Sequence, residues 1–297
     1  MQLFYGETQL LRYYRKLAKL VTRLAKLVTR LQQSRPVVIL GSNYVYKIYP
    51  QKIAYLAERA LSAANAFEME PFKSMNPVLQ RSVVNLYFVQ IHVQKKVGVR
   101  TSYAFNKKAQ KFRENFVLDA VRRIPRDSPL CPWHKSLETV VINKLLPALP
   151  LEVREFIEHE MCGVMLPVTG CHGDFGASNL VFDSDDVPYL IDWDCYRANG
   201  SFIQDACRAF VMINLSNIKA TEGKDLVKAV ALFLNNAGNL EKVTGLNRVQ
   251  LAIIWALNHY LVRSTSLHLD TFDVKRVDQF SALCLTLQSA KASGVGH

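Results

Sequence analysis

The sequence predicts an α+β protein with a small antiparallel sheet in its first third and a mostly helical remainder. Two short strand-forming runs, 37–40 and 44–49, flank the turn Gly41-Ser42-Asn43, which is typical of a tight β-hairpin. From residue 103 onward, apolar residues recur at spacings of three and four, which is typical of helices. A polar segment at 171–200 interrupts this helical part and carries the densest cluster of chemically capable side chains.

Length and composition allow two compact units. The chain has 297 residues, of which 49% are hydrophobic, and this is enough to bury a substantial core. We predict an N-terminal unit at 1–98, with a basic helix, the sheet and a further helix, and a helical unit at 99–297. The boundary is placed near Gly98, between the last strand-like run and the first long helical pattern.

A basic amphipathic helix is expected at about 8–33. Two identical heptads, 17–23 and 24–30, place leucines at alternating spacings of three and four, and therefore on one side of a helix. The segment from Thr8 to Ala57 holds ten Lys or Arg and no acid, which leaves only +2 of the net charge of +12 for the other residues. The leucine face could pack on the protein itself, lie on a membrane surface or an acidic partner, or form a dimer seam.

The other elements are predicted from periodicity and from helix breakers. A helical pattern at 52–67 follows Pro50, and the run 83–92 has the β-branched and aromatic residues that suit the last strands of the sheet. Further helices are expected at 103–126, 151–162, 201–214, 224–236, 247–264 and 273–291.

The central polar segment contains a small hairpin with oxygen-bearing side chains at its ends. Strand-forming runs at 180–182 and 189–191 are separated by turn residues. The hairpin would hold Asp174 and Asn179 before its first strand and Asp192 after its second, so the three side chains can converge. Such oxygens suit Mg²⁺, which proteins hold through one or two carboxylates together with substrate phosphates. The alternative is that these residues cap turns and end a strand.

The spacing of these residues indicates a more specific chemistry. Asn179 follows Asp174 by five residues and precedes Asp192 by thirteen, which matches a kinase catalytic loop. The motifs His172-Gly173-Asp174 and 191–194 (IDWD) resemble those of the aminoglycoside phosphotransferase and choline kinase family, the small-molecule branch of the protein-kinase-like fold. The resemblance implies a two-lobed kinase-like fold, with Asp174 as the catalytic base and His172 as a brace of the loop. It also implies that Asn179 and Asp192 are magnesium ligands.

The resemblance also implies nucleotide-binding residues in the first unit. Lys47, in the second predicted strand, would reach the α- and β-phosphates, and Glu58 on the next helix would steady it. No glycine occurs between Glu7 and Leu40, so the turn that contains Ser42 is the candidate for covering the phosphates. The alternative for Lys47 is a strand lysine that points to solvent.

Asp205, in the predicted helix at 201–214, has two interpretations. The resemblance implies that it buttresses the catalytic loop. A first-turn acid that the helix dipole favours would look the same in the sequence.

These patterns predict a small-molecule kinase that transfers the γ-phosphoryl group of ATP or GTP to a hydroxyl acceptor, with Mg²⁺ as cofactor. The alternative is a catalytically weak or inactive kinase-shaped scaffold that uses its basic helix on a membrane or an acidic partner. The intact Asp174, Asn179 and Asp192 favour the enzyme, and the missing glycine loop favours the scaffold. Nucleic acid is not an expected partner, because the basic charge is confined to one segment.

Cysteine usage and hydropathy indicate the compartment. The six cysteines show no C-x-x-C pair, which argues against a disulfide framework or a zinc site. The sequence has no run of about eighteen apolar residues and no secretion-signal pattern at its start. We therefore expect a cytoplasmic protein with reduced thiols.

Overall fold

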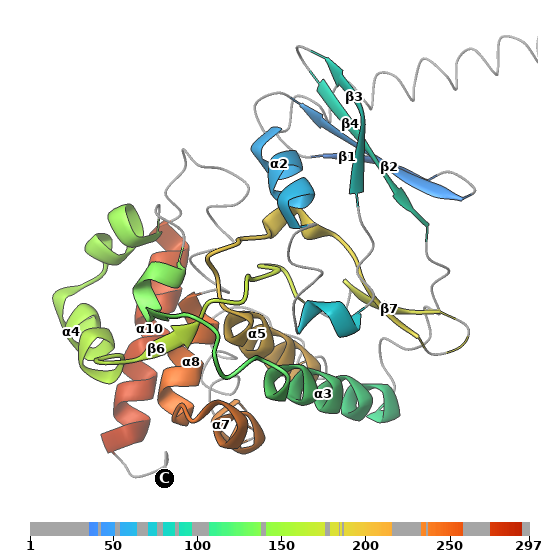
Figure 1. Cartoon of the computed structure of the whole chain (residues 1–297). Coiled ribbons are helices and arrows are strands. Elements are labelled where there is room, and N and C mark those ends of the chain that lie inside the picture. Colours follow the sequence, from blue (N-terminus) through green and yellow to red (C-terminus); the bar gives the residue numbers. More distant parts are fainter. Residues whose placement is uncertain are drawn as a thin grey trace, which may run out of the picture. The chain divides into compact units, whose positions relative to one another are not determined.

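The computed structural model describes most of the chain after its first 35 residues (Figure 1). The described residues are 36–40, 43–50, 54–63, 71–75, 80–86, 89–96, 107–137, 141–175, 179–183, 185, 187–215, 233–235, 237–257 and 274–292. The predicted helix at 8–33, Ser42 and the predicted boundary residue Gly98 lie outside these residues.

The chain divides into two compact units. One consists of Met1–Ala57 and Gln80–Lys96, and the other of Glu58–Leu79 and Val97–His297. The predicted division into 1–98 and 99–297 stays a prediction.

The first unit contains a four-stranded antiparallel sheet. Its strands lie in the order β1-β2-β4-β3 (Figure 1) and have the bounds β1 (Val37–Leu40), β2 (Tyr44–Pro50), β3 (Gln80–Leu86) and β4 (Val89–Lys95). The predicted run at 83–92 covers parts of two strands, β3 and β4, because strand-forming residues continue on both sides of their connection.

One face of this sheet buries a lysine and a histidine. Lys47 and Tyr49 are two residues apart on β2, so their side chains lie on the same face, and Lys47 is directly opposite His92 of β4. Lys47 is only 6% exposed, which excludes the alternative of a lysine that points to solvent. Burial, and to a lesser extent the charge of Lys47, lowers the pKa of His92. The ring of His92 packs against that of Tyr49, with 5.1 Å between ring centroids.

The second unit is mostly helical, as the sequence predicts. α7 was not predicted, because it opens on Gly238 and Asn239, which are poor helix formers. The other helices fall within a few residues of the predicted ranges wherever those residues are described. After α2 (Ala54–Ser62), the helices are α3 (Lys107–Arg122), α4 (Leu151–Glu160), α5 (Phe202–Leu215), α7 (Gly238–Thr244), α8 (Arg248–Ala256) and α10 (Val274–Ala292).

The core of the second unit is built around α5. This helix packs against α3 on one side and α8 on another (Figure 1), and α4 packs against α10. Every residue from Ser201 to Phe210 is buried. Phe202 contacts Phe72 of the short helix η3 (Phe72–Met75) edge to face, at 5.4 Å between ring centroids. The first turn of α5 is therefore a fixed point against which nearby loops can be held.

Two small antiparallel strand pairs lie within or just before the central polar segment. The predicted hairpin is formed by β7 (Leu180–Phe182) and β8 (Pro188–Leu190). A second pair, β5 (Leu130–Pro132) and β6 (Met165–Pro167), lies just before the polar segment in the chain. Within the part of the chain that the structure describes, no helix has the length and apolar character needed to cross a membrane.

Candidate active site

The loop with the His-Gly-Asp motif is held by a buried carboxylate. The backbone N–H groups of His172 and Gly173 donate to Oδ2 and Oδ1 of Asp205, at 2.5 and 2.9 Å. Asp205 lies in the first turn of α5 and is 1% exposed. Burial raises the pKa of Asp205, while the two donated bonds oppose this rise because they favour the ionised form. The two interpretations of Asp205 are thus resolved in favour of the buttress.

His172 ties this loop to the β7–β8 hairpin. Its Nδ1 accepts the backbone N–H of Asp174 at 3.2 Å, and its Nε2 lies 2.9 Å from the carbonyl oxygen of Ile191. Because a backbone N–H can only donate, Nδ1 is the acceptor and the ring carries its proton on Nε2. The ring is fully buried and packs on Trp193 at 4.7 Å between centroids. His172 therefore braces the loop through both ring nitrogens.

Asp174 has a polar partner at each carboxylate oxygen. The amide nitrogen Nδ2 of Asn179 donates to the backbone carbonyl of Asp174 at 2.8 Å and to its Oδ2 at 3.2 Å. The guanidinium of Arg208 forms an ion pair with Oδ1 and also donates to the carbonyl of Gly173 at 3.3 Å. The Asp174 side chain is nevertheless 32% exposed, so the carboxylate is held in place and remains open to solvent.

Asp192 lies immediately after Ile191, which is hydrogen-bonded to Asn179 and to His172. The N–H of Ile191 donates to the carbonyl of Asn179 at 2.9 Å, and its carbonyl accepts from His172. Asp192 has φ 66° and ψ 66°, and among the described residues it is the one non-glycine with positive φ. This left-handed conformation is uncommon for residues other than glycine, although Asp adopts it more readily than most, and it is often found at functional sites, where surrounding contacts enforce it. Trp193, which follows, is 1% exposed and anchors the turn.

Gly173 is required by the shape of the loop. Its φ is +78°, and a Cβ built on it would lie 2.3 Å from the carbonyl oxygen of Cys195. No other residue fits there without moving the turn that follows Asp192.

A second buried set of hydrogen bonds connects the start of the loop, at Cys171, to α5 and to the short helix η5 (Trp133–Ser136). Arg197 exchanges backbone hydrogen bonds with Cys171, both at 2.9 Å, and its Nη2 donates to Oε1 of Gln204 at 2.7 Å. Gln204 in turn donates through Nε2 to the hydroxyl of Ser136 at 2.6 Å. Ser136 ends η5. The loop is thereby connected to α5 and to η5.

The structure brings four of the predicted site residues into one neighbourhood. Asp174 is hydrogen-bonded to His172 through its backbone N–H and to Asn179 through its side chain. Asp192 directly follows Ile191, whose N–H donates to the carbonyl of Asn179. Their catalytic and metal-binding roles stay predictions.

The predicted nucleotide residues do not all belong to the same unit. Lys47 is buried in the first unit. Glu58 is an exposed residue of α2 and belongs to the second unit. Ser42 lies outside the described residues, so the predicted roles of these three residues stay predictions.

Arg208 is the site residue that the sequence analysis missed. It lies three residues after Asp205, so both side chains leave the same side of α5, and its side chain is 5% exposed. That spacing on a predicted helix was the available signal: a basic residue one turn beyond a loop-bracing acid can reach the same loop.

The oxygens at the site suit Mg²⁺. Nδ2 of Asn179 is directed at Asp174, so Oδ1 is the atom of this amide that could bind a cation, and Asp192 supplies a carboxylate. Among the described residues, no group of three or more His, Cys, Asp or Glu could hold a metal ion.

The comparisons with known proteins agree with the motifs. Residues 94–217 match the model of the phosphotransferase enzyme family, APH. Among curated proteins, none matches this sequence significantly.

Three solved structures illustrate the distant likeness. The GDP complex of wild-type aminoglycoside 2′-phosphotransferase-IIIa is 12% identical, with 88% of this chain and 90% of that chain covered and a TM-score of 0.47. The gentamicin complex of APH(2″)-IIa is 15% identical, with 85% and 88% covered and a TM-score of 0.44. APH(3″)-Id from Streptomyces rimosus ATCC10970, with ADP and streptomycin, is 15% identical, with 90% and 98% covered and a TM-score of 0.42.

The family match spans the loop with the His-Gly-Asp motif, the β7–β8 hairpin and α5, the three parts that the hydrogen bonds join. The resemblance seen in the motifs is thereby confirmed by a match of residues 94–217 to the model of the APH phosphotransferase enzyme family.

Proposed function

We propose that the protein transfers the γ-phosphoryl group of ATP or GTP to a hydroxyl group of a small molecule. The observation that carries this proposal is the partly exposed carboxylate of Asp174, fixed by Arg208 and Asn179 on a loop that Asp205 braces. The loop lies in the segment that matches a phosphotransferase family.

Asp174 would accept the proton of the acceptor hydroxyl. As the proton moves to the carboxylate, the hydroxyl oxygen bonds the γ-phosphorus, and the bond from this phosphorus to the bridging oxygen breaks to release ADP or GDP. Little covalent chemistry is required of the protein, so positioning of the hydroxyl and the phosphates supplies most of the rate. Arg208 and Asn179 hold the carboxylate in one orientation, which is the positioning that this step needs.

Asn179 and Asp192 would hold Mg²⁺, which when bound neutralises negative charge on the phosphates. Lys47 is proposed to contact the α- and β-phosphates, with Glu58 as its partner and Ser42 in the turn that covers them. The predicted cytoplasmic location is kept as part of the proposal.

A kinase-shaped scaffold without turnover is the second candidate. The observation that favours it is the lack of any glycine between Glu7 and Leu40, where a phosphate-covering loop would be expected. Contact of the N-terminal helix with a membrane surface belongs to this candidate.

Two conservative variants test the proposal. Asp192→Asn is expected to abolish the Mg²⁺-dependent part of nucleotide binding, measured as the thermal shift with ATP or GTP, because it removes a metal-binding charge. Asp174→Asn should keep that shift and lose turnover by roughly 10²–10⁴-fold, the range of a general base. Turnover is measured as transfer of radiolabelled γ-phosphate to a panel of hydroxyl compounds.

Asp119→Asn, on the exposed side of α3, is the matched control and should leave both readouts unchanged. Normal turnover in Asp174→Asn would remove that residue as the base. A Mg²⁺-dependent nucleotide shift without transfer to any acceptor, in the unaltered protein, would favour the scaffold.

A further inference from the structure

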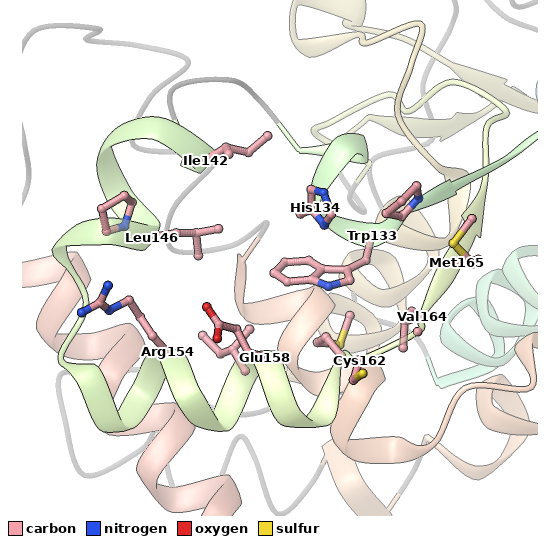
Figure 2. A pocket seen from close by; sticks show the side chains of 14 residues that line it. Trp133, His134, Ile142, Leu146, Arg154, Glu158, Cys162, Val164 and Met165 are labelled. Carbon is pink, nitrogen blue, oxygen red and sulfur yellow. The ribbon is translucent and has the colours of Figure 1, made fainter.

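A cavity of about 610 Å³ lies in the second unit, and no residue of the proposed active site lines it. It is enclosed by η5, by the short helices η6 (Val141–Leu145) and η7 (Leu146–Ala148), by α4 and by the start of β6 (Figure 2). Its volume falls in the range of small-molecule sites, roughly 300–1,000 Å³. The lining residues are Pro132, Trp133, His134, Ile142, Leu146, Pro147, Arg154, Ile157, Glu158, Met161, Cys162, Gly163, Val164 and Met165.

Most of the cavity wall is aliphatic or sulfur-containing. Ile157 and Met161 form a buried floor on α4, 2% and 0% exposed. Figure 2 shows Ile142 and Leu146 across the cavity from α4, with the indole of Trp133 between them and the helix. Trp133, Ile142 and Leu146 are half-buried, so they present apolar surface to the cavity that the fold itself does not cover. Such a wall suits an alkyl chain, which gains by leaving water.

Arg154 lies toward one end of the cavity (Figure 2) and has an unmet hydrogen-bonding need. Its Nε atom is buried and finds no hydrogen-bond partner within the part of the chain that the structure describes. A buried N–H without an acceptor is costly, and a guanidinium meets this need best with a carboxylate, which it binds through two parallel bonds. Glu158, one turn further along α4, is exposed and also lines the cavity, and Figure 2 shows its carboxylate on the side of α4 that faces Leu146.

We propose that this cavity binds a free medium-chain carboxylate, with its anionic head on Arg154 and its alkyl chain along Leu146, Ile157 and Trp133. Arg154 is the one Lys or Arg among the lining residues, and together with the mostly apolar wall it matches a ligand with one anionic head and an apolar tail. The site is independent of phosphoryl transfer, so this proposal does not depend on the proposed function.

The test measures dissociation constants of three ligands with the same chain, octanoate, octylamine and 1-octanol, by calorimetry on the full-length protein below micelle-forming concentrations. Octanoate is expected to bind roughly tenfold or more tightly than the other two, as one charge-assisted contact to Arg154 allows. Arg154→Gln should bring octanoate to the affinity of octanol. Leu146→Gln, at a half-buried wall position, should weaken all three ligands.

Arg122→Gln is the matched control, since it removes the same charge from an exposed position on α3. It should leave the three dissociation constants unchanged. Equal or tighter binding of octylamine, or an octanoate affinity that Arg154→Gln leaves intact, would overturn the proposal.

A lipid could supply the same chemistry, so vesicles of phosphatidylglycerol form a separate arm. If Arg154→Gln weakens binding to vesicles while octanoate does not bind the unaltered protein, a membrane lipid is the ligand and the proposal of a free carboxylate fails.

Discussion

Arg208 determines how the carboxylate of Asp174 is presented, since its guanidinium bonds both that side chain and the preceding carbonyl. Arg208→Gln is therefore expected to lower kcat by about 10–100-fold, the range of one charge-assisted hydrogen bond, and to change KM for nucleotide little. Arg208→Lys should restore part of kcat, because it returns the charge without the two-pronged geometry. Steady-state kinetics of phosphoryl transfer measure both effects.

Arg122→Gln serves again as the control for loss of a positive charge, and its kinetics should match those of the unaltered protein. An equal fall in kcat in Arg208→Gln and Arg208→Lys would show that Arg208 only supports the fold. A kcat that does not change would exclude it as a positioning residue.

Replacing Gly173 or Gly163 by alanine would separate the cost of a strained backbone conformation from the cost of a steric clash. Both have positive φ, but a Cβ on Gly163 meets nothing within 4 Å, whereas one on Gly173 would lie 2.3 Å from the carbonyl oxygen of Cys195. Gly163→Ala should cost about 1 kcal/mol of unfolding free energy from backbone strain alone. Gly173→Ala should cost clearly more. Urea unfolding of the two variants measures the difference, and equal losses would show that the loop relaxes to accept the methyl group.

The sequence predicted the contents of the catalytic loop better than its supports. Fixed spacing places Asp174 and Asn179 on one loop, and a turn between two short strands predicts the hairpin that ends near Asp192. The ion pair with Arg208 had one signal in the sequence, its spacing of three residues from Asp205, and this signal is useful only once the side of α5 that faces the loop is known. The positive φ of Asp192, which precedes the buried Trp193, is not encoded by any local pattern.

At the scale of elements, α4 and α10 are linked by an ion pair that should make their packing sensitive to pH. Glu160 is 7% exposed and accepts from Nζ of Lys291 at 2.6 Å. Burial by itself would raise the pKa of Glu160, but the hydrogen bonds and charges of Lys291 and His159 outweigh it and lower that pKa. A carboxyl group whose pKa is lower in the folded state stabilises the fold at pH values above its unfolded-state pKa. This stabilisation is lost as the pH falls through the folded-state pKa.

Glu160→Gln should accordingly lose about 1–3 kcal/mol of unfolding free energy at pH 7. The loss should shrink as pH falls through the lowered folded-state pKa of Glu160 and approach zero below it, where both states of the unaltered protein are protonated. Chemical unfolding at a series of pH values measures this. Glu155→Gln, an exposed change on the same helix, should show no such trend. A constant difference between Glu160→Gln and the unaltered protein at all pH values would contradict the ion-pair explanation.

Element boundaries were predicted where breakers mark them and missed where they do not. Pro150 precedes the first residue of α4, and Gly200 lies just before α5. The 83–92 run continues through the connection of β3 and β4 without an obvious breaker, so sequence alone could not divide it. α7 carries Gly and Asn in its first turn and is held by its neighbours, including an ion pair between Glu241 and Arg248 of α8.

Across the whole molecule, burial sorts the cysteines by reactivity. Burial, and then the charge of Asp205, raises the pKa of Cys171 to about 12, and burial raises that of Cys284 to about 12. Burial also raises the pKa of Cys207 far above its usual range. Cys162 is exposed.

Iodoacetamide at pH 8 should therefore label Cys162 in the native protein and leave the three buried thiols unmodified until urea unfolds the chain. Mass spectrometry of peptides measures each site, and the unfolded sample is the control. Labelling of Cys171 at the rate of Cys162 would show that the loop opens without unfolding, and would contradict the hydrogen bonds that hold it to Asp205 and Arg197.

The sequence does not predict which segments far apart in the chain group into one compact unit. The change from a strand-like run to a helical pattern predicted one boundary near residue 98, and in the structure Glu58–Leu79 also groups with the helical unit although the sheet continues after it. Contacts such as that of Phe72 with Trp193, at 5.3 Å between ring centroids, join residues far apart in the chain, and local periodicity does not report them.

The bond between Asp205 and the catalytic loop also sets the order in which a growing chain can complete this site. His172 and Gly173 emerge from the ribosome more than thirty residues before their acceptor. A nascent chain that ends at Gly200 already contains Asp174, Asn179 and Asp192, but it lacks the helix that shapes the loop around them. Because domains fold as units during synthesis, the motif is translated first and becomes a shaped loop only after α5 has followed it.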